Sequence, residues 1–215
     1  MHRVLLSDLG NVVIFFDRRR VAAGLHALIR AKSVDEIDRL VHKSEEGGTL
    51  LEQFETGAID ALRYRQEIER LLDTPIPADD FWRIHTDLFT PNMPVMNLWR
   101  TLRSAGVVEK IIAVTDTDPV RLNAGMAPML ESCGLTLDGP VASCYIGRRK
   151  PHPAMFEAAI RTAGVPLDQC IFVDDNPAYA DAAAKIGIGA VCYRSREANA
   201  QEMLLSDLLH LGLSM

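Results

Sequence analysis

The stretch VLLSDLGN, residues 4–11, joins a short apolar run to a carboxylate and then to a loop. A near-continuous apolar run of this length is typical of a buried central strand. Asp8 stands at its end, and in an open α/β sheet the loops after the carboxyl ends of the strands are where ligands bind. A carboxylate there costs free energy unless a cation or hydrogen-bond donors meet it. We therefore interpret Asp8 as a nucleophile, a metal ligand, or both.

Later in the chain, strand-like apolar runs alternate with segments of helical period. The runs are residues 111–114, 140–143, 171–173 and 190–193. The helical segments are residues 119–132, 153–163, 178–186 and 197–211. This alternation predicts βαβ units and a mostly parallel sheet with right-handed crossovers. We expect an α/β fold.

One long stretch interrupts this alternation. Between Asp17 and about Pro94 no run is convincingly strand-like, whereas helical patterns recur at 18–30, 34–42, 58–72 and 79–88. The proline-rich piece at 90–94 is interpreted as a return linker. The sequence therefore predicts an all-helical cap, residues 17–94, inserted after the first strand. Residues 1–16 and 95–215 would form the core.

The composition of the chain restricts the classes of partner that it can bind. The 215-residue chain has a formal net charge of −6, which argues against nucleic acid or an anionic membrane as its main partner. No apolar stretch approaches a membrane span, and no secretory signal is visible. Four cysteines contain no CxxC pair. We expect a cytoplasmic protein that acts on a small molecule, as a monomer or a homodimer.

Polar residues stand at, or just after, the predicted strand ends. In chain order they are Asp8, Thr115 with Asp116, Lys150, and Asp174 with Asp175. Asp8 is suited to attack phosphorus and form an aspartyl-phosphate. Phosphoryl transfer depends mostly on positioning and charge neutralisation. A hydroxyl hydrogen bond from Thr115 and the compact cation of Lys150 would supply both.

The acidic pair predicts a cation site. Asp174 and Asp175, together with Asp8, offer the oxygen ligands that Mg²⁺ prefers. Such an ion would let an anionic nucleophile approach an anionic substrate. The run Asp174–Pro177 is also a good turn and N-cap sequence, so one of the two acids could serve only to cap the following helix.

Taken in order, these segments resemble the four motifs of the haloacid dehalogenase-like hydrolase superfamily, over the whole chain. DLGNV at 8–12 and VDDNP at 173–177 resemble a subgroup of small sugar-phosphate phosphatases. The resemblance implies a Rossmann-like, doubly wound core and a cap that closes over the substrate. It also implies a Mg²⁺-dependent phosphatase for a small phosphorylated metabolite such as a sugar phosphate. It also implies that the carbonyl of Gly10 ligates the metal, and that Asp175 is the surer ligand of the acidic pair.

Three positions depart from that pattern. Gly10 stands where most phosphatases of the superfamily carry a second Asp, whose general acid–base help is worth roughly 10²–10⁴-fold. Asp116 stands where the subgroup usually has Asn, and we hypothesise that it supplies the missing proton or contacts substrate hydroxyls. Tyr179 replaces a residue that would support the site. Asn11, a turn residue, is a candidate for touching phosphate through its backbone N–H.

Two alternatives stay open. A haloacid dehalogenase would use Asp8 to attack carbon; such enzymes also lack the second Asp and need no metal, and the acidic pair speaks against this alternative. A catalytically weak binding protein is the other, supported by the departures from the family pattern. The full set of nucleophile, hydroxyl, lysine and metal acids argues against it.

Overall fold

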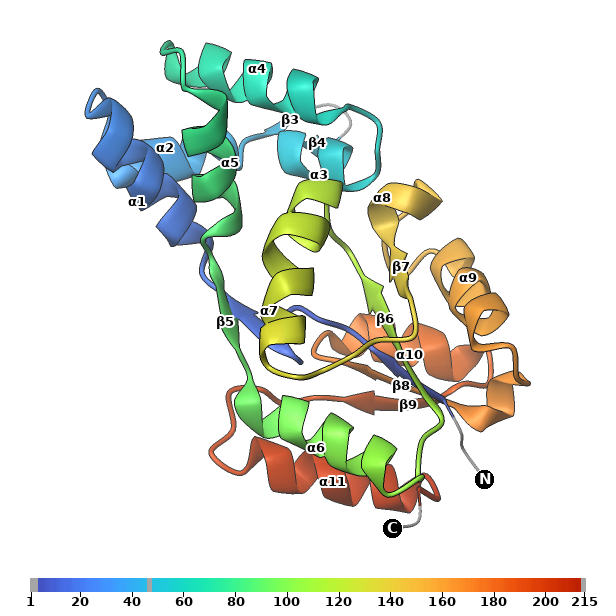
Figure 1. Ribbon diagram of the computed structural model, residues 1–215. Coiled ribbons are helices and arrows are strands. Elements are labelled where there is room, and N and C mark those ends of the chain that lie inside the picture. Colours follow the sequence, from blue (N-terminus) through green and yellow to red (C-terminus); the bar gives the residue numbers. More distant parts are fainter. Residues whose placement is uncertain (1–3, 46–47, 214–215) are drawn as a thin grey trace.

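The computed structural model describes residues 4–45 and 48–213, and its centre is a parallel sheet of five strands (Figure 1). In spatial order the strands are β7 (Pro140–Ala142), β6 (Lys110–Thr115), β1 (Val4–Ser7), β8 (Cys170–Asp174) and β9 (Gly189–Cys192). β1 pairs in parallel with β6 on one side and with β8 on the other. All four residues of β1 are buried, because helices cover both faces of the sheet.

The two faces of the sheet pack into separate helical layers. On the side of Leu5 lie α6 (Met93–Ser104), α7 (Ala127–Ser132) and α11 (Ala200–His210). On the side of Leu6 lie α9 (Pro153–Ala163) and α10 (Pro177–Lys185). Shorter helical pieces complete the core: residues 121–126, α8 (Ser143–Ile146) and residues 167–169. This arrangement confirms the predicted Rossmann-like α/β core.

Among the described residues between β1 and α6, the chain forms five helices. They stand over one end of the sheet (Figure 1). They are α1 (Arg18–Ile29), α2 (Val34–Val41), α3 (Leu50–Glu55), α4 (Ala61–Leu72) and α5 (Ala78–Thr86). Their interior holds a cluster of rings in which Phe54 stacks on Tyr64 with centroids 4.8 Å apart. Within the described residues, no helix is both long and apolar enough to cross a bilayer.

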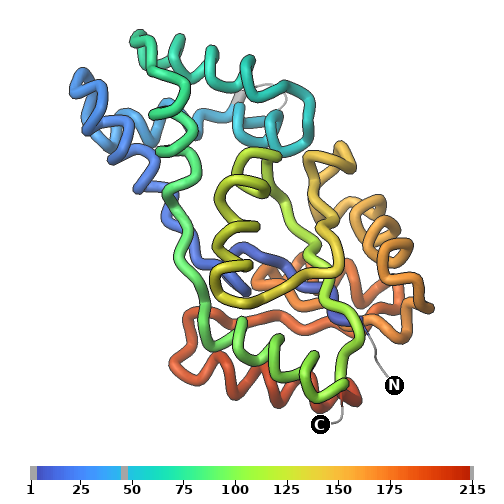
Figure 2. The backbone as a smooth tube through the Cα atoms, viewed as in Figure 1, coloured from blue at the N-terminus to red at the C-terminus, as the bar shows by residue number. Residues whose placement is uncertain are grey.

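The chain enters and leaves this helical segment through one antiparallel pair of strands. β2 (Ile14–Phe16) pairs with β5 (Phe89–Pro91), with Ile14 opposite Pro91. Figure 2 shows the two passages side by side, blue for β2 and green for β5. The described elements of the cap are therefore joined to the core at one narrow place. The division into residues 17–94 and the remainder stays a prediction.

The insert differs from the predicted all-helical segment in two respects. β5 covers the first two residues of the predicted linker, and β3 (Ser44–Glu45) pairs with β4 (Gly48–Thr49). The structure also contains α3 and α6, which the sequence analysis did not predict. The start of α3 was visible as a capping box, because Thr49 and Glu52 cap each other reciprocally.

Candidate active site

The floor of the site is built at the carboxyl ends of β1 and β8. Asp8 follows β1, and its Oδ1 lies 2.9 Å from Nζ of Lys150. The same Nζ donates to Oδ2 of Asp174 at 2.6 Å and to the carbonyl of Val114 at 2.9 Å. Lys150 thus joins three strand ends through one buried ammonium group.

The charge balance keeps Lys150 protonated. Burial by itself lowers the pKa of Lys150, but the neighbouring carboxylates, Asp8 first among them, outweigh it, so the pKa rises above its usual value. The ring of Tyr179 faces the same ammonium, with its centroid 5.3 Å from Nζ. The position that departed from the family pattern therefore supports the lysine through its aromatic face.

Three carboxylates converge beside this lysine. Asp8, Asp174 and Asp175 each place an oxygen within 4.8 Å of the others. Burial, reinforced by the charge of Asp8, raises the pKa values of Asp174 and Asp175. Crowded acids of this kind are stabilised by a cation, and an all-oxygen donor set suits a hard divalent ion. Neither acid caps α10, because the side chain of Asn176 fills that position.

Thr115 and Asn11 lie in the same pocket as Asp8. Thr115 ends β6 and is buried. Asn11 has a φ of 55°, the left-handed conformation that Asn tolerates at turns. A hydrogen bond from its side chain opposes the rise in the pKa of Asp175. The structure therefore gathers every residue predicted for the site around one pocket, with Asp174 buried directly behind Lys150.

Asp116 lies above the floor, and its contacts give a role to the acid at this position. Its Oδ1 accepts a hydrogen bond from the backbone N–H of Lys150 at 3.0 Å. Burial raises the pKa of Asp116, while the charge of Lys150 opposes the rise. Asp116 also faces Arg149, with Oδ2 3.7 Å from Nε of that residue. It therefore holds the loop that carries Lys150 and still presents a carboxylate to the pocket.

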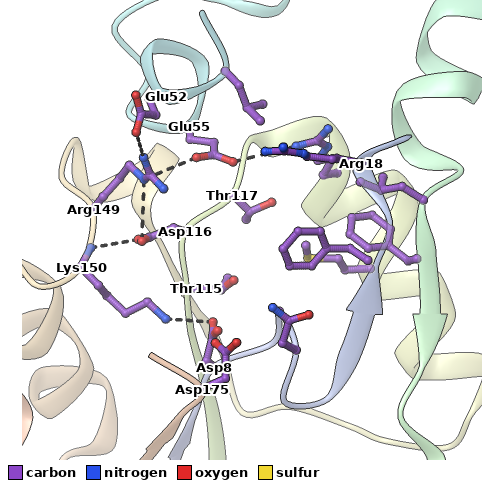
Figure 3. Close-up of a pocket in the computed structure, with 18 of the residues that line it drawn as sticks. Asp8, Arg18, Glu52, Glu55, Thr115, Asp116, Thr117, Arg149, Lys150 and Asp175 are labelled. Atoms are coloured by element: carbon purple, nitrogen blue, oxygen red, sulfur yellow. Dashed lines mark hydrogen bonds and ion pairs between the residues drawn. The ribbon is translucent and has the colours of Figure 1, made fainter. Parts of the chain in front are cut away.

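The roof of the pocket comes from α3 of the helical segment. Figure 3 shows Glu52 and Glu55 pointing toward Arg149, with Asp116 on its other side. Arg149 donates to Glu52, and its Nε lies 3.4 Å from Oε2 of Glu55. α3 is held down by Ser143, which donates to the carbonyl of Glu55 at 2.6 Å and accepts from the N–H of Thr117 at 2.9 Å.

Glu55 is the most perturbed acid of the roof. Only 7% of its surface is exposed, and burial raises its pKa to about 7, although Arg149 and Arg121 oppose this. Behind it lies a second buried contact between cap and core. His85 of α5 donates from Nε2 to Oδ2 of Asp118 at 2.9 Å; burial lowers the pKa of His85 to about 4, so the ring is neutral.

The opposite wall of the pocket is apolar. Its lining residues are Phe16, Leu88, Phe89 and Met126. The pocket as a whole measures about 370 Å³, a volume suited to a small metabolite. A substrate here would meet charged groups on one side and rings on the other.

Phe16 also accounts for the space beside Gly10. A Cβ placed on Gly10 would lie 3.2 Å from Cε1 of Phe16 and 3.8 Å from Oδ2 of Asp8. A side chain at this position would therefore point between the nucleophile candidate and the ring. Phe16 is 46% exposed, so its ring has room to yield. An aromatic ring thus borders position 10, where the family resemblance led us to expect a second acid.

Sequence reasoning missed the roof. Glu52, Glu55 and Arg149 match no catalytic motif of the sequence, and the sequence analysis assigned no role to them. The capping box of α3 could have revealed the helix, but not its approach to a loop almost 100 residues away. These contacts depend on how the cap lies over the core, which no local pattern encodes.

A family model described as haloacid dehalogenase-like hydrolase matches residues 3–187, so the chain belongs to this family of hydrolases. Flavin mononucleotide hydrolase 1 of Arabidopsis thaliana is 38% identical over 66 residues, 31% of this chain and 26% of that protein. Acyl-CoA dehydrogenase family member 10 of Mus musculus is 24% identical over 220 residues, 99% of this chain. The chain spans only 26% and 20% of the length of these two relatives.

Solved structures share the fold. A HAD-like family hydrolase from Porphyromonas gingivalis superposes with a TM-score of 0.75 at 22% identity, covering 97% of this chain and 98% of that one. A HAD family enzyme from Bacteroides thetaiotaomicron, in complex with magnesium and inorganic phosphate, gives 0.72 at 18% identity, covering 92% and 96%. L-2-haloacid dehalogenase of Xanthobacter autotrophicus gives 0.61 at 18% identity, covering 100% and 85%. At these identities the fold does not separate phosphatases from dehalogenases.

Proposed function

We propose that the protein is a Mg²⁺-dependent phosphatase that hydrolyses the phosphomonoester of a small metabolite. One observation carries the proposal: the carboxylates of Asp8, Asp174 and Asp175 converge within 4.8 Å at the pocket floor, beside the ammonium of Lys150. A dehalogenase that attacks carbon has no use for three convergent acids. A phosphatase needs them, because its nucleophile and its substrate are both anionic.

The residues divide the work as follows. Asp8 attacks phosphorus to form an aspartyl-phosphate, the bond from phosphorus to the leaving oxygen breaks, and the alcohol departs after taking a proton from water. A water molecule then attacks the aspartyl-phosphate, which releases inorganic phosphate and restores the carboxylate. Lys150 neutralises charge on the nucleophile and the phosphoryl oxygens, and the hydroxyl of Thr115 donates to one of those oxygens. Asn11 contributes its backbone N–H.

Asp8, Asp175 and the carbonyl of Gly10 would hold Mg²⁺, with Asp174 as a further acid beside it; the ion would neutralise charge between nucleophile and substrate. The substrate would enter beneath α3, whose closure excludes water during the first step.

The absence of a second acid at Gly10 has a consequence for the leaving group. Without general acid help, esters whose leaving oxygen has a low pKa are hydrolysed more readily than simple alkyl esters. The test panel should therefore contain sugar 1-phosphates, alkyl phosphates, nucleotides and an aryl phosphate. Flavin mononucleotide belongs in it as well, because one relative that matches part of the chain is a hydrolase of that compound.

The experiment is phosphate release across this panel, with Mg²⁺ and with EDTA, for the wild type and for Asp8→Asn. We expect metal-dependent release that falls by at least about 10³-fold in the variant, because the nucleophile is lost. Asp181→Asn is the matched control, since Asp181 is an exposed acid on α10 outside the pocket. Halide release from 2-haloacids without phosphate release would favour the dehalogenase. If the folded protein binds Mg²⁺ but releases neither phosphate nor halide, the result would point to a binding protein.

A further inference from the structure

Three charged side chains, those of Glu55, Asp116 and Arg149, lie together on the polar wall of the pocket. Nε of Arg149 is buried and has no hydrogen-bond partner within the described residues. Oxygens of Glu55 and Asp116 lie 3.4 and 3.7 Å from it, without the geometry of a hydrogen bond. The cluster therefore presents carboxylate oxygens and guanidinium N–H groups side by side on the pocket wall, so a polar atom of a ligand that enters there meets both acceptors and donors.

The chemistry of the cluster restricts what that atom can be. It must accept a hydrogen bond from the guanidinium of Arg149 and lie beside two carboxyl groups. A phosphate or carboxylate oxygen would accept, but the acids would repel it. An ammonium group would donate to the acids, but it cannot accept and would face a cation. A hydroxyl group both donates and accepts, and it carries no charge.

We propose that Glu55, Asp116 and Arg149 form a hydroxyl-binding subsite that selects the leaving group of the substrate. The proposal rests on the phosphatase function proposed above. The phosphoryl group lies at Asp8, and a hydroxyl of the leaving group completes the cluster beneath α3. The carbon skeleton contacts Phe16 and Phe89. The subsite favours hydroxylated leaving groups over alkyl ones and disfavours a second anionic group at the roof.

The state of Glu55 is compatible with this role. Burial raises its pKa to about 7, so near neutral pH it accepts from a hydroxyl when ionised and donates to one when protonated. Charge on the roof is otherwise balanced, because Arg149 is already paired with Glu52 and Arg121 lies between Glu55 and Asp118. The positive charges of Arg149 and Arg121 are thus matched by acids, so neither is free to attract a second anion at the roof.

The test uses three open-chain C6 esters: n-hexyl phosphate, sorbitol 6-phosphate and 6-phosphogluconate. They carry no hydroxyl, several hydroxyls, and hydroxyls with an added carboxylate. We expect kcat/KM of the wild type to favour sorbitol 6-phosphate over each of the other two by about tenfold or more, as one charge-assisted hydrogen bond would give. Glu55→Gln should reduce the preference over n-hexyl phosphate by about tenfold.

Glu52→Gln is the matched control. It removes the other contact of α3 with Arg149, so an effect that arises only from weaker cap closure would lower turnover of both esters in parallel. An equal loss of preference in Glu52→Gln and Glu55→Gln would overturn the proposal. The proposal would also be overturned if the wild type showed no preference for sorbitol 6-phosphate over n-hexyl phosphate, or if Glu55→Gln left that preference unchanged.

Two further measurements keep the outcomes distinct. Asp116→Asn, which retains the size of the side chain, replaces Glu55→Gln if that variant does not fold, and should reduce the same preference. p-Nitrophenyl phosphate reports the phosphatase reaction independently of hydroxyls. No release from it or from the C6 esters would overturn the proposed function and the subsite together. Release from it without preference among the C6 esters would overturn the subsite alone.

Discussion

Gly10 stands where the family resemblance led us to expect a second acid, and its surroundings leave room for a side chain. A side chain there would lie near Oδ2 of Asp8 and against the ring of Phe16, which is partly exposed and can move. We expect Gly10→Asp to raise kcat for an alkyl phosphate by about tenfold or more, because a general acid is restored. An aryl phosphate, whose leaving group needs no proton, should gain far less.

Gly10→Ala is the control for this change, since it meets the same ring without bringing a carboxyl group. Steady-state kinetics on the two esters distinguish the variants. A similar change in kcat for Gly10→Asp and Gly10→Ala would show that displacement of Phe16, rather than proton transfer, is responsible. An increase in kcat in the single variant Asp116→Asn would contradict the hypothesis that Asp116 donates the missing proton.

Glu55 should make stability depend on pH. Its pKa rises from 4.5 to about 7 on folding, so the folded protein binds the extra proton between these values. The stability that this provides is complete below pH 4.5 and is lost as pH rises through 7, by about 3 kcal/mol at most. The side chain introduced by Glu55→Gln stays neutral. The free energy of unfolding of this variant should therefore rise relative to that of the wild type between pH 5 and pH 8.

Urea unfolding of both proteins at the two pH values measures this difference. Glu52 provides a control of opposite sign, because the hydrogen bond from the backbone of Thr49 and the contacts with Arg149 lower its pKa. The contribution of Glu52 to the free energy of unfolding is therefore lost as pH falls. The free energy of unfolding of Glu52→Gln should lie furthest below that of the wild type at pH 8. Wild-type and Glu55→Gln stabilities that change in parallel with pH would contradict the assignment to Glu55.

The residues on the floor could be predicted, whereas those of the roof could not, and the reason is physical. Asp8, Thr115 and the acidic pair each follow an apolar strand, and parallel strands bring their ends to one edge whatever the details of packing. Glu55 and Arg149 meet only because α3 lies over the loop before α9. That meeting depends on the angle of the cap, so their joint presence in the pocket had no sequence signature.

At the scale of elements, the five core strands were predicted because each is a short, mostly apolar run between turn signals, and the central strands β1 and β8 are buried throughout. α6 was missed because Pro94 was interpreted as part of a linker, although a proline in the first turn is favourable in a helix. β2 and β5 are three residues each, too short for alternation to reveal them. Such a pair exists only because the two passages of the chain lie together.

The contact between α3 and α8 gives a prediction at this scale. Ser143 is buried, and its hydroxyl serves Glu55 of the cap and Thr117 of the core at once. Ser143→Ala would leave a buried carbonyl and a buried N–H without their partner, so we expect a loss of about 1–3 kcal/mol in the free energy of unfolding. Urea unfolding measures it, with Ser104→Ala as the control, because the exposed Ser104 bonds only to a carbonyl of its own helix. A loss no larger than in the control would contradict this account.

For the whole molecule, the acidic cluster predicts stabilisation by Mg²⁺. An ion that binds only the folded protein adds about 2.7 kcal/mol at a hundredfold excess over its Kd. Thermal unfolding with Mg²⁺ and with EDTA should show this rise in Tm for the wild type. Asp175→Asn should reduce the rise strongly, whereas Asp181→Asn should keep it. An equal rise in all three proteins would place the ion elsewhere.

The central position of β1 has a consequence for biosynthesis. Its partners in the sheet, β6 and β8, lie more than 100 and more than 160 residues further along the chain. At translation rates of about 5–20 residues per second, β1 is synthesised roughly 5–21 s before β6 and roughly 8–33 s before β8. Until β6 is made, an apolar strand and its terminal aspartate have no neighbouring strand of the sheet to pair with. The five helices that follow β1 are complete long before β8 is made, so the nascent chain can acquire a folded cap while its catalytic half still awaits closure.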